Sequence, residues 1–258
     1  MITVTKIMEQ VYVLKDQTEC CANLVIGTEK ALLFDTGSGV DDMLKAVRII
    51  TNLPLLIIAS HGHFDHIGGS AAFDKVYLSA EDWTLLDVYT DEILNKWLCE
   101  MVPGEERENL AFQSNQWKQM RKLDFKKFDL GNLECQVLPL KGHTKGSIGI
   151  YIPCLKLLLS GDALTPVMCL HFYNHLTKEV QIETLKRVEM LDFDYYLTSH
   201  HDRSLPKSMV GRMIDCIKRS NGRKHYKYQY PRPPYTKGWF YLDSIEEEPI
   251  GLVVDRLD

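Results

Sequence analysis

The segment that most constrains this chain of 258 residues is a short apolar run, LLIIA, followed at once by SHGHFDH. An apolar run of this length bounded by polar residues is typical of a buried strand. In an extended loop leaving that strand, side chains two apart point the same way, so His61 and His63 face one point. Asp65 and His66 offer a carboxylate and a third imidazole to a neighbouring point. One metal ion cannot easily use all four groups, whereas two ions roughly 3.5–4 Å apart can.

Three later segments each place a further candidate ligand after an apolar strand. The first, KGHTKGS, carries His143 in a glycine-flanked turn. The second, LSGD, ends on Asp162, a lone carboxylate of the kind that can bridge two cations. The third, TSHH, ends on His200 and His201. Because every segment follows a strand, we expect all of them to converge at one edge of the sheets.

The order of apolar segments predicts an α/β protein. Strands are expected at 11–14, 22–26, 30–35, 55–59 and 75–78, with a helix that Asp41 can cap after the third. The second half repeats this rhythm, with a hairpin at 128–138, paired strands at 148–160, a strand at 194–198 and two helices. Two β-rich blocks closed by helices predict two sheets packed face to face with helices outside, in one domain covering 1–258.

Two regions stand apart from this pattern. Residues 80–122 have near-helical apolar spacing and are expected to form inserted helices, which either add packing or cover a substrate pocket. Residues 220–258 are expected to form a basic, aromatic C-terminal tail.

Composition limits the functional classes. Hydrophobic residues make up 45% and charged residues 25%, which are ordinary values for a globular protein. The net charge of −5 gives no general attraction to nucleic acid. The N-terminus lacks the basic start and apolar run of a signal peptide, and no stretch approaches the ~20 apolar residues of a membrane span. Seven cysteines without paired CxxC spacing favour a reduced, cytoplasmic protein.

The motifs in order, LLFDTG, HGHFDH, GHTKGS, SGD and SHH, resemble those of the metallo-β-lactamase superfamily. Scattered structural histidines would not be expected to reproduce this series. The resemblance implies an αββα four-layer sandwich of two mixed β-sheets, here with a helical insertion. It also implies two divalent metal ions per chain. Zn²⁺ is the expected metal, and the donor set also accepts Fe or Mn.

By this resemblance each candidate ligand receives a role. His61, His63 and His143 would bind the first metal ion. Asp65, His66 and one of the last two histidines would bind the second, with Asp162 bridging. The family usually shows Gly-His-Gly where this chain has Ser199-His200-His201, and aligning Ser199 with the first glycine favours His200 over His201. Asp35 would hydrogen-bond the ligand loop; the alternative is that it is only a turn residue at a strand end.

The function implied is that of a metal-dependent hydrolase in which a metal-bridging hydroxide attacks a small ester, thioester or lactone. Asp65 would orient the nucleophile and pass a proton to the leaving group, and Asp162 would hold both metals. A carboxylate at Asp162, where class B1 β-lactamases carry Cys, resembles the glyoxalase II and lactonase branches. A β-lactamase is therefore less consistent with the sequence.

Other classes remain open at this point. A phosphodiesterase or nuclease of the RNase Z type shares the ligand set, and a mononuclear iron persulfide oxygenase is not excluded by the ligands. Residues 203–237 hold ten Lys or Arg against one acid, interleaved with tyrosines, which suits an anionic substrate or phosphate and equally a solvated surface.

The expected partner is a small molecule, which can be anionic, rather than nucleic acid or membrane. The apolar insertion could serve as a homodimer surface. His171 and His175 are predicted as substrate contacts, the alternative being surface or core histidines.

Overall fold

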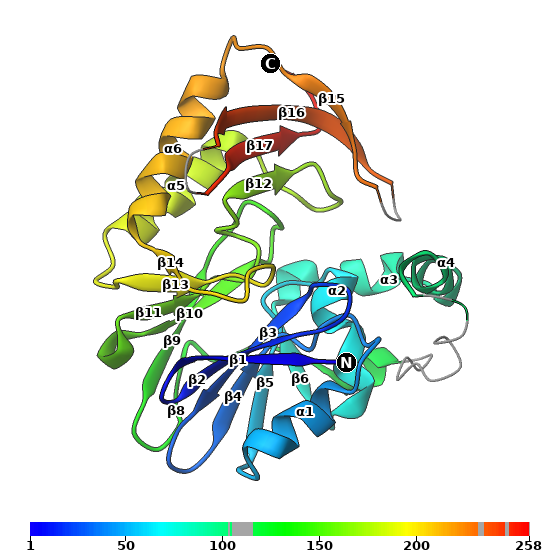
Figure 1. Cartoon of the computed structure of the whole chain (residues 1–258), viewed down its shortest axis with the longest axis vertical. Helices are drawn as coiled ribbons and strands as arrows, with labels where there is room; N and C mark the ends of the chain where they lie inside the picture. Colours follow the sequence, from blue (N-terminus) through cyan, green and yellow to red (C-terminus); the bar gives the residue numbers. More distant parts are fainter. Residues whose placement is uncertain (103, 105–115, 232–234, 246–247, 258) are drawn as a thin grey trace.

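The computed structural model (Figure 1) describes residues 1–102, 104, 116–231, 235–245 and 248–257. Within them, a first sheet runs in the order β1-β2-β3-β4-β5-β6-β7, antiparallel from β1 to β4 and parallel from β4 to β7. Its strands are β1 (Thr3–Met8), β2 (Val11–Lys15), β3 (Cys21–Ile26), β4 (Ala31–Phe34), β5 (Leu55–Ile58), β6 (Val76–Leu78) and β7 (Met120–Lys122).

A second sheet within the same described ranges has the order β14-β13-β11-β10-β9-β8. The pair β11–β13 is parallel and the other neighbours are antiparallel. Its strands are β8 (Lys127–Asp129), β9 (Glu134–Pro139), β10 (Ile148–Ile152), β11 (Leu157–Leu159), β13 (Tyr195–Leu197) and β14 (Leu205–Pro206).

The two sheets pack face to face. Successive side chains of a central strand point alternately to the other sheet and to the outer helices. Leu32 and Phe34 of β4 belong to a buried cluster that also contains Ile150 of β10. Their neighbour Leu33 turns to the other face of the sheet, where it packs with Val47 of α1 (Met43–Ile50). This period of two is the pattern of a strand buried on both faces.

Two long helices cover the second sheet. The helices α5 (Lys178–Glu189) and α6 (Ser208–Ser220) bury Leu185 and Met213 in a cluster that includes Tyr196 of β13. Together with α1 on the first sheet they complete the predicted αββα arrangement. The remaining short helices are α2 (Phe64–Ile67), η1 (Gly68–Ala72), η2 (Ala80–Asp82), α3 (Leu85–Val88), α4 (Asp91–Met101), η4 (Gln116–Gln119) and η5 (Pro153–Leu155).

The N-cap of α1 is Asp42 rather than the predicted Asp41. The Asp42 side chain accepts a hydrogen bond from the backbone N–H of Lys45 at 2.9 Å. Asp41 instead accepts the backbone N–H of Gln17 and pairs with the terminal amine of Met1. Contacts with distant segments thus decide which of two adjacent aspartates caps the helix.

The C-terminal region is not a tail. The strands β15 (Tyr226–Gln229), β16 (Lys237–Ser244) and β17 (Ile250–Val254) join β12 (Val167–Leu170) in a third sheet of the described chain, ordered β12-β17-β16-β15. Figure 1 shows this sheet at the top, beside α5 and α6. The parallel pairing of β17 with β12, far upstream in the chain, gives these residues a partner that local sequence does not reveal.

The inserted segment contains the helices α3 and α4, and residues 103 and 105–115 of the predicted insertion lie outside the described residues. In α4, Leu94, Trp97 and Leu98 bury a cluster with Phe64, which immediately follows His63. The insertion is therefore packed against the candidate ligand loop. In the described part of the chain, none of the helices is long and apolar enough to cross a membrane.

Candidate metal centre

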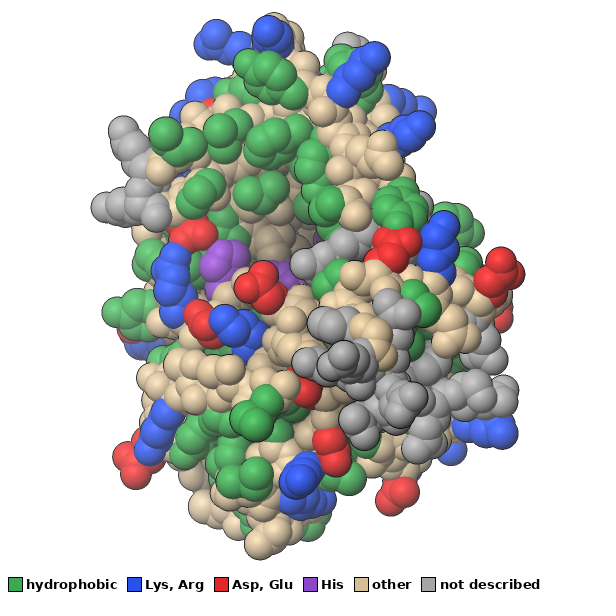
Figure 2. All heavy atoms as spheres, turned by 45° about the vertical axis from the view of Figure 1, so that its right-hand side comes forward, with side chains coloured by type: hydrophobic (Ala, Val, Ile, Leu, Met, Phe, Trp, Pro, Cys, Tyr) green, Lys and Arg blue, Asp and Glu red, His purple; other side chains and the backbone are tan. Residues whose placement is uncertain are grey.

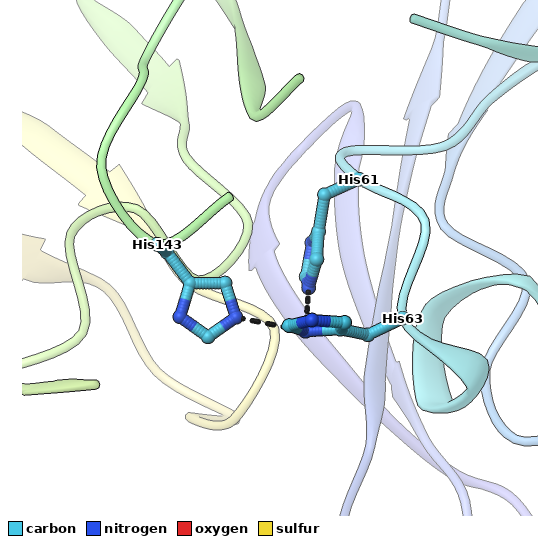
Figure 3. A group of neighbouring side chains, drawn as sticks. All are labelled: His61, His63 and His143. Atoms are coloured by element: carbon cyan, nitrogen blue, oxygen red, sulfur yellow. Dashed lines mark hydrogen bonds between the residues drawn. The ribbon is translucent and has the colours of Figure 1, made fainter. Parts of the chain in front are cut away.

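Three imidazoles from two loops converge on one point (Figure 3). His61 and His63 lie in the loop after β5, and His143 lies in the loop between β9 and β10. His61 Nε2 is 2.9 Å from His63 Nδ1, and His143 Nε2 is 3.0 Å from the same atom. The ligand atoms of the three residues all lie within 4.8 Å of one another, and all three side chains are buried.

Burial keeps this first cluster in the form that binds metals. Burial lowers the pKa of His63 and of His143 to about 4 each, despite nearby carboxylates. Burial, together with the neighbouring histidines, also lowers the pKa of His61. All three imidazoles are therefore neutral at pH 7, and neutral imidazole is the state that ligates a cation.

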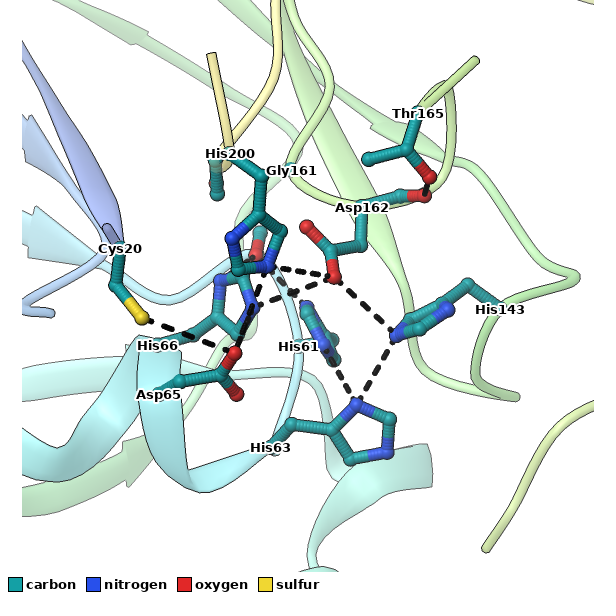
Figure 4. A network of polar contacts seen from close by, with 12 residues as sticks. Cys20, His61, His63, Asp65, His66, His143, Gly161, Asp162, Thr165 and His200 are labelled. Atoms are coloured by element: carbon teal, nitrogen blue, oxygen red, sulfur yellow. Dashed lines mark hydrogen bonds and ion pairs between the residues drawn. The ribbon is translucent and has the colours of Figure 1, made fainter. Parts of the chain in front are cut away.

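A second cluster combines carboxylates and imidazoles beside the first (Figure 4). Asp65 Oδ2 lies 3.6 Å from His66 Nε2 and 3.5 Å from His200 Nε2. Asp162 Oδ2 is 3.2 Å from His200 Nε2 and 3.5 Å from His66 Nε2. The same Asp162 oxygen is 3.6 Å from His143 Nε2 of the first cluster. Asp162 thus stands between the two clusters, where a bridging ligand belongs.

Two buried atoms of this cluster have unmet bonding capacity. His66 Nε2 and Asp162 Oδ1 are buried without a hydrogen-bond partner among the described residues. Buried polar groups are normally satisfied, so such atoms indicate a missing ion or water. Imidazole nitrogens and carboxylate oxygens are the donors that Zn²⁺ takes. The residues present therefore fit a pair of divalent cations.

The charges of the second cluster differ from those of the first. Burial opposes protonation of His200, but the carboxylates of Asp162 and Asp65 outweigh it and hold its pKa at about 9. The same competition between burial and the carboxylates of Asp65 and Asp162 raises the pKa of His66. Protonated His66 and His200 thus balance the carboxylates when no cation is bound. A cation that bound in the cluster would displace these protons.

Asp35 holds together two ligand-bearing segments, the loop of Ser60 and His66 and the loop of Ser199. Its carboxylate accepts the backbone N–H of Ser60 at 2.6 Å and the Ser199 hydroxyl at 2.6 Å, and it lies 2.9 Å from His66 Nδ1. Asp35 is fully buried and has a φ of +72°, a left-handed conformation that a non-glycine residue adopts only when its surroundings impose it. This placement suits the hydrogen-bonding role expected for it.

The structure separates the two adjacent histidines at the end of β13. His200 Nε2 faces the carboxylates of Asp65 and Asp162. His201 turns away, with Nε2 3.0 Å from a Glu248 carboxylate oxygen and Nδ1 3.0 Å from the Thr198 hydroxyl. Of the two, His200, the residue favoured from the sequence, is therefore the one that lies among the other candidate ligands.

His171 and His175 are not brought to the cavity described below, so their placement does not support the predicted substrate contacts. His171 is buried, with its ring 4.2 Å from that of Phe172 and 5.5 Å from that of Tyr228. His175 Nε2 lies 3.6 Å from an Asp255 carboxylate oxygen. His171 thus packs against residues of the third sheet, and His175 lies beside the residue that follows β17.

Asp82 is a buried carboxylate that the sequence did not single out. It accepts the backbone N–H of Gly62 at 3.0 Å and the Thr144 hydroxyl at 2.6 Å. It also accepts the backbone N–H of Gly146 at 2.8 Å and the Asn174 amide at 2.7 Å. One side chain thus ties the loop of His61 and His63 to the loop of His143. These partners lie 20 to 92 residues away in sequence, so no local motif marks Asp82.

Replacing Asp82 with alanine is expected to destabilise the fold by roughly 3 kcal/mol, because several donors lose their acceptor at once in a buried site. Asp82→Asn, which keeps one acceptor oxygen, should cost less. Urea unfolding measures both effects. The exposed neighbour Asp87 in α3 supplies the control, and Asp87→Ala should stay within about 0.5 kcal/mol of the parent. Equal losses at the two positions would contradict the role assigned to Asp82.

A cavity of about 480 Å³ opens over both clusters. Figure 2 shows this hollow with histidine side chains at its floor and hydrophobic side chains above it. Its walls are largely apolar, and no Lys or Arg is among the described residues that line it. One wall comes from the insertion and the other from the region of the third sheet. The apolar lining includes Tyr89, Ile93, Trp97, Val167, Phe172 and Tyr230.

Comparison with known proteins shows similarity to metal-dependent hydrolases. A family model described as the metallo-beta-lactamase superfamily matches residues 19–78. The chain is 29% identical over 159 residues to the acyl-coenzyme A thioesterase MBLAC2 of Homo sapiens, which covers 55% of this chain and 57% of that protein. It is 22% identical over 209 residues to a hydroxyacylglutathione hydrolase of Xanthomonas euvesicatoria, covering 81% of this chain and 71% of that one. The chain thus spans little more than half the length of the human relative.

A solved structure, the metallo-beta-lactamase from Pontibacter korlensis, shares the fold. It superposes with a TM-score of 0.62 at 18% identity and covers 84% of this chain and 99% of its own. At that identity the likeness concerns the fold alone. In its sandwich of two sheets, its ordered His and Asp segments at one edge and the match of residues 19–78 to the family model, the chain is similar to the metallo-β-lactamase superfamily.

Proposed function

We propose that this protein is a dinuclear metal-dependent hydrolase that cleaves thioesters carrying an apolar acyl group. The observation that carries the proposal is the position of Asp162, whose Oδ2 lies within 3.6 Å of imidazoles from both clusters. Two ligand sets that share one carboxylate suit two adjacent cations. Zn²⁺ is the metal we assign, because it takes both imidazole and carboxylate ligands.

The residues divide the work between holding metals and handling protons. His61, His63 and His143 would hold one ion, and Asp65, His66 and His200 the other, with Asp162 shared. When bound, the two ions would supply an activated water at neutral pH and polarise the thioester carbonyl. Asp65, which lines the cavity, would orient that water through its carboxylate. It would then carry the proton released by water to the departing thiolate, giving a carboxylic acid and a thiol.

The cavity favours an apolar acyl group. Ile93 and Trp97 line one side, and Val167 and Phe172 line the other. Burying an acyl chain against such walls gains roughly 0.8 kcal/mol for each methylene. A phosphodiester would be favoured by Lys or Arg near the metals, yet the described lining contains neither. The relatives named an acyl-coenzyme A thioesterase and a hydroxyacylglutathione hydrolase add support for thioesters over β-lactams.

None of the described Lys and Arg residues of the basic stretch 203–237 lines the cavity. Arg203 pairs with Glu248, and Arg219 pairs with Asp243. Tyr228 and Tyr230 of the same stretch do line the cavity. A described lining that takes tyrosines but no Lys or Arg from this stretch suits an apolar substrate better than a phosphate. This distribution of charged and aromatic residues favours a thioesterase over a nuclease.

The test is a comparison of kcat/KM for the zinc-loaded chain on four substrate classes: acyl thioesters, lactones, phosphodiesters and β-lactams. The kcat/KM for thioesters should exceed that for each other class by at least about tenfold, because each methylene of the acyl chain adds binding energy in the cavity. Preference for phosphodiesters would overturn the assignment of substrate class. It would leave the metal centre itself standing.

Ile93 offers a test of the acyl wall. Replacing it with asparagine puts a polar group into the apolar lining and is expected to raise KM for long-chain thioesters roughly tenfold. Thioesters with a two-carbon acyl group should be nearly unaffected, because they do not reach the wall. The control is Ile49→Asn, at an isoleucine that is 80% exposed on α1. An equal change for short and long acyl chains would count against the wall.

A further inference from the structure

Cys20 places a sulfur beside the second ligand cluster, although no motif gives it a role. It precedes β3 in the loop from β2 and is only 2% exposed. Its Sγ lies 3.9 Å from Asp65 Oδ2. The sulfur, an Asp65 carboxylate oxygen and a His200 ring nitrogen all lie within 4.8 Å of one another. Figure 4 shows the Cys20 side chain directed at Asp65.

The ring nitrogen of His66, unpaired within the described chain, is a second observation that points to a cation at this position. His66 is 1% exposed, and its Nε2 has no hydrogen-bond partner among the described residues. That nitrogen lies 3.6 Å from the same Asp65 oxygen that Cys20 approaches. Two buried atoms that can bind a metal, His66 Nε2 from α2 and Cys20 Sγ from the β2–β3 loop, therefore approach the same Asp65 carboxylate oxygen. A cation at this point would satisfy both.

The backbone of the β2–β3 loop is built to direct Cys20 inward. The buried Asp16 Oδ1 accepts the backbone N–H of Thr18 at 2.9 Å and that of Cys20 at 3.0 Å. Between them, Glu19 has a φ of +66°, which reverses the chain. The adjacent Cys21 points the other way and packs in the apolar core between the sheets. The two neighbouring cysteines thus occupy different environments, and only Cys20 faces the cluster.

We propose that Cys20 is a thiolate ligand of the second metal ion, alongside Asp65, His66, His200 and the shared Asp162. This inference rests on the dinuclear centre proposed above and adds a ligand to it. Zn–S and Zn–O bonds of about 2.3 and 2.1 Å keep sulfur and oxygen within about 4.4 Å of each other around one ion, which admits the observed 3.9 Å. The thiol proton leaves to water as the metal–sulfur bond forms. A sulfur ligand favours Zn²⁺ over Mn²⁺ at this position.

The test uses Co²⁺ as a spectroscopic replacement for zinc in the full metal-free chain. Sulfur bound to Co²⁺ gives a near-ultraviolet charge-transfer band that nitrogen and oxygen ligands do not give. The parent chain should gain this band as the second equivalent of Co²⁺ binds. Cys20→Ser should lose the band, keep the visible bands of the bound ions, and bind its second equivalent at least about tenfold more weakly.

Two other cysteines supply matched controls. Cys21→Ser changes the neighbouring buried thiol, and Cys169→Ser changes the thiol in the cavity wall. Both variants should retain the band. A parent chain that binds two Co²⁺ without the band, or a band that survives Cys20→Ser, overturns the role of Cys20 and leaves the dinuclear centre intact. Failure to bind two Co²⁺ at all overturns the centre itself.

Discussion

Asp162→Ala is expected to lower kcat for thioester hydrolysis by roughly 10²–10³-fold or more, comparable to removing a group that stabilises the transition state. The reason is geometric, because Asp162 Oδ2 is the atom within 3.6 Å of both His143 and His200. Its loss would remove the ligand that the two proposed metal positions share. It also leaves His66 and His200 without a carboxylate that balances their charge. Steady-state thiol release, measured alongside the zinc content of each chain, checks the result.

The matched control for Asp162→Ala is Asp192→Ala. Asp192 has a side chain that is 80% exposed and pairs with Lys156 on the surface. Its removal should leave kcat within about twofold of the parent, since exposed ion pairs contribute little. If Asp162→Ala retained parental activity and two zinc ions, the bridging role would be refuted.

Removal of the metals is expected to lower Tm by roughly 10 °C and to abolish hydrolysis. A ligand held at about 1,000 times its Kd stabilises the native state by about 4 kcal/mol, and 1 kcal/mol shifts Tm by about 2–4 °C in chains of 150–250 residues. Without cations, protonated His66 and His200 balance Asp65 and Asp162. Calorimetry of chelated and zinc-reloaded protein measures the difference.

The histidines provide the control for this experiment. In His143→Ala, the Tm gained on adding zinc should shrink, because one ligand of the first ion is gone. In His225→Ala, whose ring nitrogen lies beside the Arg223 carbonyl instead of at the site, the gain should be unchanged. A Tm that does not respond to chelation in the parent chain would be inconsistent with a metal centre.

Sequence patterns predicted the parts of the fold that depend on local periodicity. The alternation of Leu32, Leu33 and Phe34 between two buried clusters matches a strand covered on both faces. Because the candidate ligands directly follow such strands, their convergence at one sheet edge was predictable too. The assignment of His61 and His63 to one metal ion and of Asp65 and His66 to the other stays a prediction, since His61 also lies near His66 and Asp162.

The features missed depend on contacts between distant segments. β17 pairs with β12, so the C-terminal region becomes part of a sheet that its own composition does not indicate. Asp82 acquires its role only because the loops of Gly62 and Thr144 meet around it. His171 lies near the ligands in sequence, but its ring packs against Phe172 and Tyr228. Cys20 stands 45 residues from Asp65, and the loop that directs it inward carries no known motif.

The most direct test of the dinuclear centre is an anomalous-difference map of crystals grown with zinc, recorded at the zinc absorption edge. We predict two peaks roughly 3.5–4 Å apart, the usual separation in two-metal hydrolytic sites. One should lie among His61, His63 and His143, the other among Asp65, His66 and His200, with Asp162 between them. A single peak, or peaks away from these residues, would contradict the account.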